Sequence, residues 1–299
     1  MWETALAFAI WGSYGSVLTA AHIDPVLTAI ARSAGLGILL TIASVAIARL
    51  RGPHEITAAI PWRSGALWLS GSVLLVDEVF YSVSAVNGPV AIIGLAYGCV
   101  PILAPLLSRL AGTDRGETMR ARHWVCLALA FAGNAVVFRE LQAARIPFTM
   151  AAAFAFFAGL LFTVMPVCSA RLQQEGLGTW AVLKGQAAVA AILAVPLLAL
   201  LIVLGIVSLG GAGHAAVVRR SVEMGAVNAV AFTLTPFYLW YRGIGRCGVA
   251  RTSICAFAEP LVATLFSLVG LEDAPATPLL IAGVALVLGA IAVSTRSAE

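Results

Sequence analysis

Two adjacent carboxylates, Asp77 and Glu78, lie within the apolar run VLLVDEVFYS, with Tyr81 one helical turn after the first of them. A charged side chain at the centre of a bilayer costs about 2.5–3.5 kcal/mol on insertion scales, so two neighbouring ones need a reason. Residues four apart share a helix face, which places Asp77 beside Tyr81. We favour a site for a substrate amine or a proton over a structural tie to a basic residue, and the choice between the two carboxylates stays open.

A third carboxylate, Glu259, lies in another apolar stretch, directly before Pro260. Burial favours the neutral form of a carboxyl group, which suits reversible protonation. A hydrogen bond to backbone groups freed by the proline is an equally acceptable role. We therefore take Asp77, Glu78 and Glu259 as the candidates for proton coupling.

Aromatic side chains could complete the same site. Trp11 and Tyr14 are three residues apart on one expected helix, Tyr97 follows the acidic run, and Phe232 lies close to Asn228. Aromatic faces attract cations, so these rings together with carboxylates predict a cavity for an amphipathic, amine-bearing solute, although most membrane aromatics only pack. The predicted cavity residues are Trp11, Tyr14, Asp77, Glu78, Tyr81, Tyr97, Asn228, Phe232 and Glu259.

Two basic residues, Arg32 and Lys184, fall inside apolar runs. Long basic side chains can lie along apolar surface and extend their charge to the interface, and we expect this of Arg32. Lys184, with Gln186 close by, has the better claim to a polar cavity position. All three residues could also be structural.

The composition is that of a polytopic membrane protein. Of 299 residues, 61% are hydrophobic and 11% are charged, against about 25% charged in soluble domains. The mean hydropathy is +0.98. Basic residues are spread singly between apolar runs, which argues against a nucleic-acid partner. Five cysteines without CxxC spacing, and no Walker motif, give no reason to expect a metal, a cofactor or direct use of ATP.

Ten apolar stretches are long enough to approach or reach the roughly 20 residues of a helical span, so we predict an all-α integral membrane protein. With the N-terminus in the cytoplasm, the inner segments would hold 12 arginines and the outer loops four, which predicts that both termini are cytoplasmic. The expected spans are 4–20, 26–48, 65–85, 89–110, 123–138, 148–170, 180–207, 222–241, 248–270 and 276–294.

An internal repeat divides the chain into residues 1–140 and 141–299. The segments that begin at Ala91 and Ala250 align at a constant offset of 159, which pairs Pro101 with Pro260. Five helices in each half would insert the halves in opposite directions. Inverted repeats around a site at the membrane midplane are a recurring architecture of secondary carriers.

These features resemble the EamA family of the drug/metabolite transporter superfamily. The matching elements are Trp11-Gly12, Arg32 shortly after Pro25, Pro101, and AEPLVATLFSLVGLED at 258–273. The usual Gly-Glu after the fourth helix is replaced around Gly112–Asp114. The resemblance implies ten helices, a cavity lined by helices 1, 3, 4, 6, 8 and 9, and transport of amino acids, nucleosides, drugs or choline.

The expected function is therefore secondary transport of amino acids or similar small amphipathic metabolites by alternating access, most simply export across a bacterial cytoplasmic (inner) membrane. An uptake carrier for choline-like cations and a passive facilitator or channel are the alternatives. An enzyme is not expected, because the histidines fall in loops or at helix ends and a single Asp lies at membrane depth. The expected partners are a small-molecule substrate, the lipid bilayer, protons and a second copy in a homodimer.

Overall fold

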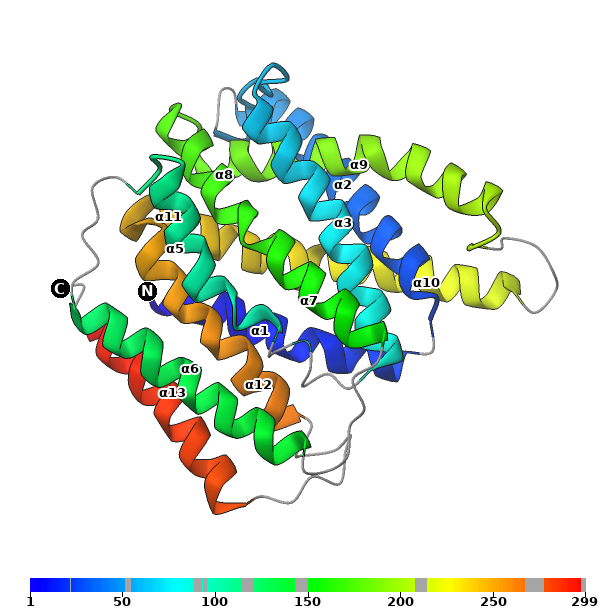
Figure 1. Cartoon of the computed structure of the whole chain (residues 1–299). Coiled ribbons are helices and arrows are strands. Elements are labelled where there is room, and N and C mark those ends of the chain that lie inside the picture. Colours follow the sequence, from blue (N-terminus) through cyan, green and yellow to red (C-terminus); the bar gives the residue numbers. More distant parts are fainter. Residues whose placement is uncertain are drawn as a thin grey trace.

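A computed structural model describes residues 1–21, 23–51, 55–88, 93, 96–114, 121–142, 150–207, 214–266 and 277–296. This part of the chain is all-helical, without a β-strand, and Figure 1 shows the arrangement. The elements are α1 (Trp2–Ala20), α2 (Pro25–Arg51), the 3-10 turn η1 (Glu55–Thr57), α3 (Gly65–Asn87), α5 (Val100–Leu110), α6 (Ala121–Gln142), α7 (Met150–Phe162), α8 (Val164–Gln174), α9 (Thr179–Val203), α10 (His214–Asn228), the π-helix η2 (Ala229–Leu234), α11 (Thr235–Ile254), the 3-10 turn η3 (Cys255–Phe257), α12 (Ala258–Phe266) and α13 (Pro278–Arg296).

Four helical segments of the described chain are long and apolar enough to cross a membrane: Pro25–Leu50, Gly65–Asn87, Met150–Gln174 and Thr179–Val203. Shorter apolar helices lie at Val100–Leu110, Trp124–Val136 and Pro278–Val293. Large apolar side chains face outward on several of them, for example Ile42 and Val195, which are 62% and 70% exposed. Outward-facing apolar surface of this kind is what contact with lipid requires, so the chain is a membrane protein.

The expected ten spans differ from the helices in three places. The span 148–170 is divided at Thr163 into α7 and α8. The span 89–110 is described only from residue 93 on and with gaps, and its regular part is α5. The spans 222–241 and 248–270 meet inside α11, where Gly248 has a left-handed φ of 78° and kinks the chain. Of the repeat, Ala91 and Asp273 lie outside the described residues, as do Arg115, Arg120 and Arg145 of the charge count. A count of ten helices stays a prediction.

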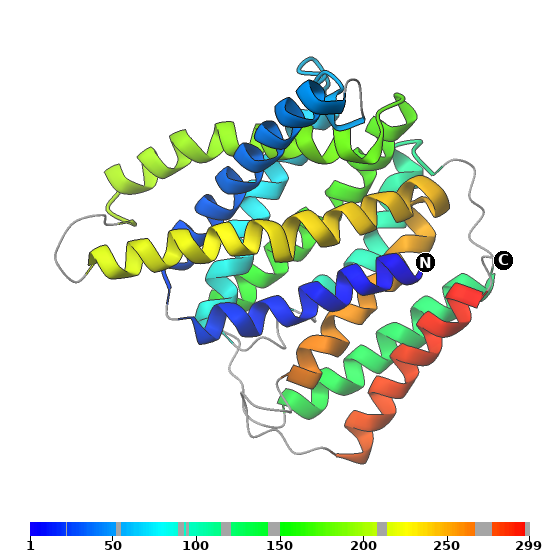
Figure 2. The same ribbon diagram turned by 180° about the vertical axis from the view of Figure 1, so that it is seen from behind.

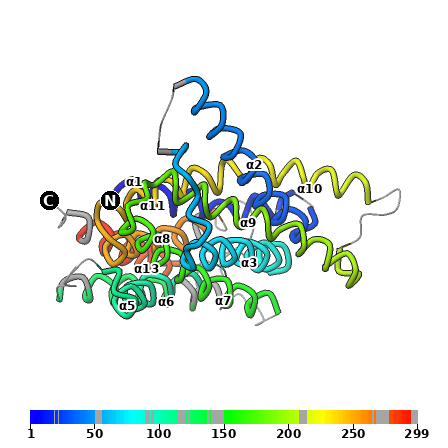
Figure 3. Tube along the Cα trace, turned by 90° about the horizontal axis from the view of Figure 1, so that it is seen from above, coloured from blue at the N-terminus to red at the C-terminus, as the bar shows by residue number. Residues whose placement is uncertain are grey.

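The helices form a central group and a peripheral pair. α3 packs against α2, α7, α8 and α9, while α1 packs against α11 and α12. Seen from behind, α10 and α11 continue one another across the molecule beside α1 (Figure 2). α6 and α13 lie side by side at one edge and pack chiefly against each other (Figure 1). From above, the C-terminal part of α2 projects from the body (Figure 3).

The start of α2 is fixed by its sequence. Pro25 stands at the first helical position, where its missing N–H costs nothing, and Asp24 Oδ1 accepts the N–H of Leu27 at 2.8 Å as a helix cap. The N–H of Asp24 is donated to Ser221 Oγ on α10 at 2.9 Å. These contacts set the register between α2 and α10, and thereby the depth of Arg32 two turns into α2.

Glycines allow two of the closest helix approaches. A Cβ at Gly12 of α1 would lie 2.5 Å from the carbonyl oxygen of Glu259, and one at Gly159 of α7 would lie 2.6 Å from the carbonyl oxygen of Ala96. Both approaches bring a helix directly against backbone, which only glycine permits at these distances. The first of them brings α1 against the carboxylate-bearing turn of α12.

Candidate functional site

A small cavity lies where α1, α2, α3, α7, α11 and α12 meet. Its free volume is about 20 Å³, room for about one water molecule. The free space is therefore too small for a solute larger than water, and a larger solute can bind only when the helices around the cavity separate. Its lining consists of Trp11, Tyr14, Arg32, Asp77, Glu78, Tyr81, Tyr97, Phe162, Phe237 and Glu259.

The cavity brings together seven of the nine predicted cavity residues. The other two, Asn228 and Phe232, lie outside its lining. The lining also holds Arg32, for which an interfacial position was expected, and two residues that the sequence analysis missed, Phe162 and Phe237.

Arg32 is buried, with 1% of its surface exposed, so the expectation that its charge reaches the interface is wrong. Its guanidinium forms an ion pair with Glu78 through Nη1. Nη2 donates to the carbonyl oxygen of Phe232 at 2.6 Å, and Nε donates to Thr233 Oγ1. The ring of Tyr14 covers one face, 4.2 Å from Cζ. The charge of Arg32 stays inside the protein because the buried carboxylate of Glu78 and the backbone carbonyl of Phe232 bind it there.

The backbone carbonyl that binds Arg32 belongs to Phe232, in the π-helix η2. Pro236, four residues later, has no N–H, so it cannot supply the α-helical hydrogen bond to this carbonyl. The carbonyl instead accepts from Arg32 and, at 2.8 Å, from Nε1 of Trp11. π-Helical turns are frequent at functional sites. Phe232 thus acts through its backbone, while its ring packs on Tyr14 at 5.0 Å.

Asp77 and Glu78 both point into protein because α3 is surrounded by other helices. They are 3% and 4% exposed. Adjacent helical residues point about 100° apart, so the two carboxylates meet different partners. Glu78 pairs with Arg32, whereas Asp77 Oδ1 accepts the hydroxyl of Tyr97 at 2.6 Å. Neither carboxylate is exposed to lipid.

Glu259 is the carboxylate of the cavity without such a partner. It is 2% exposed, and its Oε2 has no hydrogen-bond partner among the residues that the structure describes. It lies in the first turn of α12, directly after the 3-10 turn η3. A buried carboxylate oxygen without a donor calls for an explanation, and a water molecule, an ion or a ligand can supply the missing contact.

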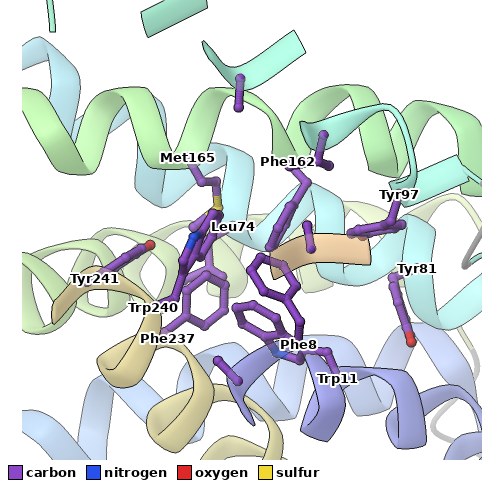
Figure 4. Close-up of a cluster of buried hydrophobic side chains, with 14 of the residues drawn as sticks. Phe8, Trp11, Leu74, Tyr81, Tyr97, Phe162, Met165, Phe237, Trp240 and Tyr241 are labelled. Carbon is purple, nitrogen blue, oxygen red and sulfur yellow. The ribbon is translucent and has the colours of Figure 1, made fainter. Parts of the chain in front are cut away.

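Aromatic rings form most of the remaining wall (Figure 4). Trp11 packs edge-on against Phe162 at 5.5 Å and Phe237 at 4.8 Å. Tyr14 stacks on Tyr81 at 5.2 Å. Edge-to-face and offset pairs of this kind stabilise by about 0.5–1.5 kcal/mol beyond their buried area. The wall is therefore a rigid aromatic surface around charged groups.

A sequence signal for Phe162 existed. Three aromatic residues of the site region stand four positions before a proline: Tyr97 before Pro101, Phe162 before Pro166, and Phe232 before Pro236. A proline in a helix frees the carbonyl four residues earlier and bends the helix there. An aromatic residue four positions before a proline therefore lies at the bend of its helix.

Lys184 and Gln186 do not line the cavity. Lys184 Nζ donates to the carbonyl oxygen of Ala58 at 2.6 Å and to Ser44 Oγ at 3.4 Å, which ties α9 to the segment after α2. Gln186 Nε2 donates to Ser169 Oγ on α8 at 3.2 Å. Of the two roles that the sequence left open for Lys184 and Gln186, a polar cavity position and a structural one, these contacts fit the structural one, since both residues join helices. In the described ranges, no group of three or more His, Cys, Asp or Glu side chains could hold a metal ion.

Comparison with known proteins identifies the fold. No family model matches the sequence, and no curated protein matches it. A solved structure described as "Crystal structure of protein" is similar over 98% of this chain and 96% of its own, with a TM-score of 0.70 and 23% identity. At this level of identity the similarity shows a shared helical fold and nothing about function.

Proposed function

We propose that this protein is a secondary carrier for small amine-bearing solutes, which include amino acids and similar metabolites. The observation that carries the proposal is a small cavity lined by three carboxylates, one guanidinium and aromatic rings. Ionisable groups buried in a membrane protein are costly and are placed for function. We further propose membership of the EamA family and a role in transport rather than in catalysis.

The proposed architecture is a pair of inverted five-helix repeats in ten spans. Helix packing supports it: α3 packs on α9 and α10 packs on α2, while α3 packs on α7 and α11 packs on α1. Glycines stand at two of these crossings, Gly71 of α3 against Val189 of α9, and Gly225 of α10 against Ala31 of α2. Each half thus contributes the same kind of contact to the other half, as an inverted repeat requires.

Alternating access would open the cavity to one membrane face and then to the other. Prolines stand near the cavity in α5, α8, α11 and α12, where they free backbone carbonyls and permit bending. We propose export across a bacterial inner membrane, with both termini in the cytoplasm. The alternative that the geometry also favours is transport of choline-like cations, because the aromatic wall and the excess of carboxylates suit a cation.

The test is flux into proteoliposomes of labelled aromatic, aliphatic and hydroxy amino acids and of choline, with and without a pH gradient. Wild-type protein is compared with Asp77→Asn and with Glu223→Gln, an exposed acid of α10 that serves as the control. Saturable flux that is lost in Asp77→Asn and kept in Glu223→Gln supports a carrier. Flux that needs the pH gradient makes protons the coupling ion, and flux without it makes the protein a facilitator. No flux of any solute by folded protein contradicts the proposal.

A further inference from the structure

Among the described residues of the cavity lining, the guanidinium of Arg32 is the one cationic group, and its nitrogens are already engaged. Nη1 meets Glu78, Nη2 meets the Phe232 carbonyl, and Nε meets Thr233. The ring of Tyr14 covers one face. A substrate carboxylate would have to displace one of these partners before it could bind to Arg32.

From this arrangement we infer that the solute is an organic cation that carries no carboxylate, and that Glu259 is the residue that binds its ammonium group. The inference rests on the carrier function proposed above and narrows its substrate class. A zwitterionic amino acid would bring its own carboxylate into a space that already holds Asp77, Glu78 and Glu259.

The formal charges of the cavity favour a cation. The lining holds three carboxylates and one guanidinium, and the guanidinium is ion-paired with Glu78. Within the described part of the chain, Asp77 and Glu259 form no ion pair. Lys184, the other basic residue within an apolar run of the sequence, is bonded to the Ala58 carbonyl and Ser44. A positive solute supplies the missing counter-charge, whereas a buried, unpaired carboxylate of a zwitterion is strongly disfavoured.

Glu259 rather than Asp77 fits the role of the ammonium-binding residue. Asp77 already accepts the Tyr97 hydroxyl at 2.6 Å. Glu259 Oε2 is buried in the cavity wall and has no donor in the described chain. Gly12 lets α1 approach the Glu259 backbone, which holds this turn of α12 beside Trp11. The aromatic rings of the wall can then surround the remaining faces of an ammonium group, as in quaternary-ammonium sites.

The experiment measures equilibrium binding to the full-length protein in lipid nanodiscs with two matched pairs of probes: phenethylamine against phenylalanine, and choline against glycine betaine. Within each pair the second compound carries the carboxylate. We expect the cation of at least one pair to bind about tenfold to a hundredfold more tightly than its zwitterion, the range of a charge-assisted contact. Equal binding within both pairs, tighter binding of a zwitterion, or no binding of any probe overturns the inference.

Variants test the assignment of the residue. Glu259→Gln keeps the size of the side chain and removes its charge, so we expect it to lose most of the cation preference. Glu223→Gln makes the same change on an exposed face of α10 and should keep the preference in full. Each variant is first shown to be monodisperse and to unfold with the wild-type free energy, within about 1 kcal/mol. A folded Glu259→Gln protein with an unchanged preference overturns the assignment.

Flux of the same four probes separates the inference from the function on which it rests. If the zwitterion of a pair shows saturable flux equal to or greater than that of the matched cation, the result supports the carrier function and refutes the cation site. Tight binding of the cation without flux of any probe supports the cation site and contradicts the carrier.

Discussion

Replacing Glu78 by glutamine keeps the shape of the side chain but removes the charge that faces Arg32. Removing one partner of a buried ion pair costs about 3–5 kcal/mol, because the other charge is left without compensation. Arg32 keeps its contacts with Thr233, the Phe232 carbonyl and the Tyr14 ring, so we expect the lower end of that range. A loss of about 3 kcal/mol lowers the ratio of folded to unfolded protein by more than a hundredfold.

The double variant Arg32→Met/Glu78→Met gives the contrasting result. Apolar residues of similar volume in place of a buried ion pair are often neutral or stabilising, so the double variant should unfold within about 1 kcal/mol of wild type. Arg32→Met alone should cost about as much as Glu78→Gln alone. The assay is equilibrium unfolding in mixed detergent micelles. It compares Glu78→Gln with wild type, and it analyses wild type, Arg32→Met, Glu78→Met and the double Met variant as a double-mutant cycle.

A double variant as unstable as the sum of its two single Met variants would refute this reasoning, because it would mean that the two charges do not compensate each other. A Glu78→Gln protein within about 0.5 kcal/mol of wild type would refute it as well, since surface substitutions produce changes of that size.

Three further changes can be measured with the same unfolding assay. Trp11→Phe keeps most of the ring but removes the indole hydrogen bond to the π-helix, and should lower the free energy of unfolding by about 0.5–1.5 kcal/mol. An unchanged free energy of unfolding would mean that this hydrogen bond does not stabilise the fold. Gly12→Ala places a Cβ 2.5 Å from the Glu259 carbonyl and should cost about 1–3 kcal/mol, whereas Gly289→Ala, with nothing within 4 Å, should be neutral or stabilising. Equal effects of these two substitutions would contradict the close approach of α1 and α12. Gly248→Ala imposes a side chain on a left-handed φ of 78° and should cost about 1–2 kcal/mol, and a neutral result would be evidence for a regular helix there.

Much of the site could be predicted from the free-energy cost of placing a charged side chain in lipid. A carboxylate is so unfavourable in lipid that Asp77, Glu78 and Glu259 had to face protein, and the structure places all three around one cavity. The all-helical fold followed from hydropathy in the same way. What the sequence could not supply was the partner of each charge, because pairing depends on how neighbouring helices are rotated against each other.

Arg32 illustrates that limit. Its distance from the start of its helix suggested that the charge could reach the interface, but the Asp24 cap and its contact with Ser221 set the helix so that the guanidinium faces Glu78. Phe232 lies outside the cavity lining for a related reason. It stands within the π-helix η2, whose wider turn changes the direction in which its side chain points relative to a regular helix.

The pairing of α6 with α13 has a consequence for how the chain is made. Residue 142 ends α6, and its main partner begins only at residue 278. At roughly 5–20 residues per second, the ribosome needs about 7–27 s to synthesise the intervening 135 residues. During that interval Gly133, which later approaches the Gly283 carbonyl, is without its partner. Until α13 has been made, α6 must be sheltered by lipid, by the insertion machinery or by earlier helices, so this pair of helices can assemble only late in synthesis.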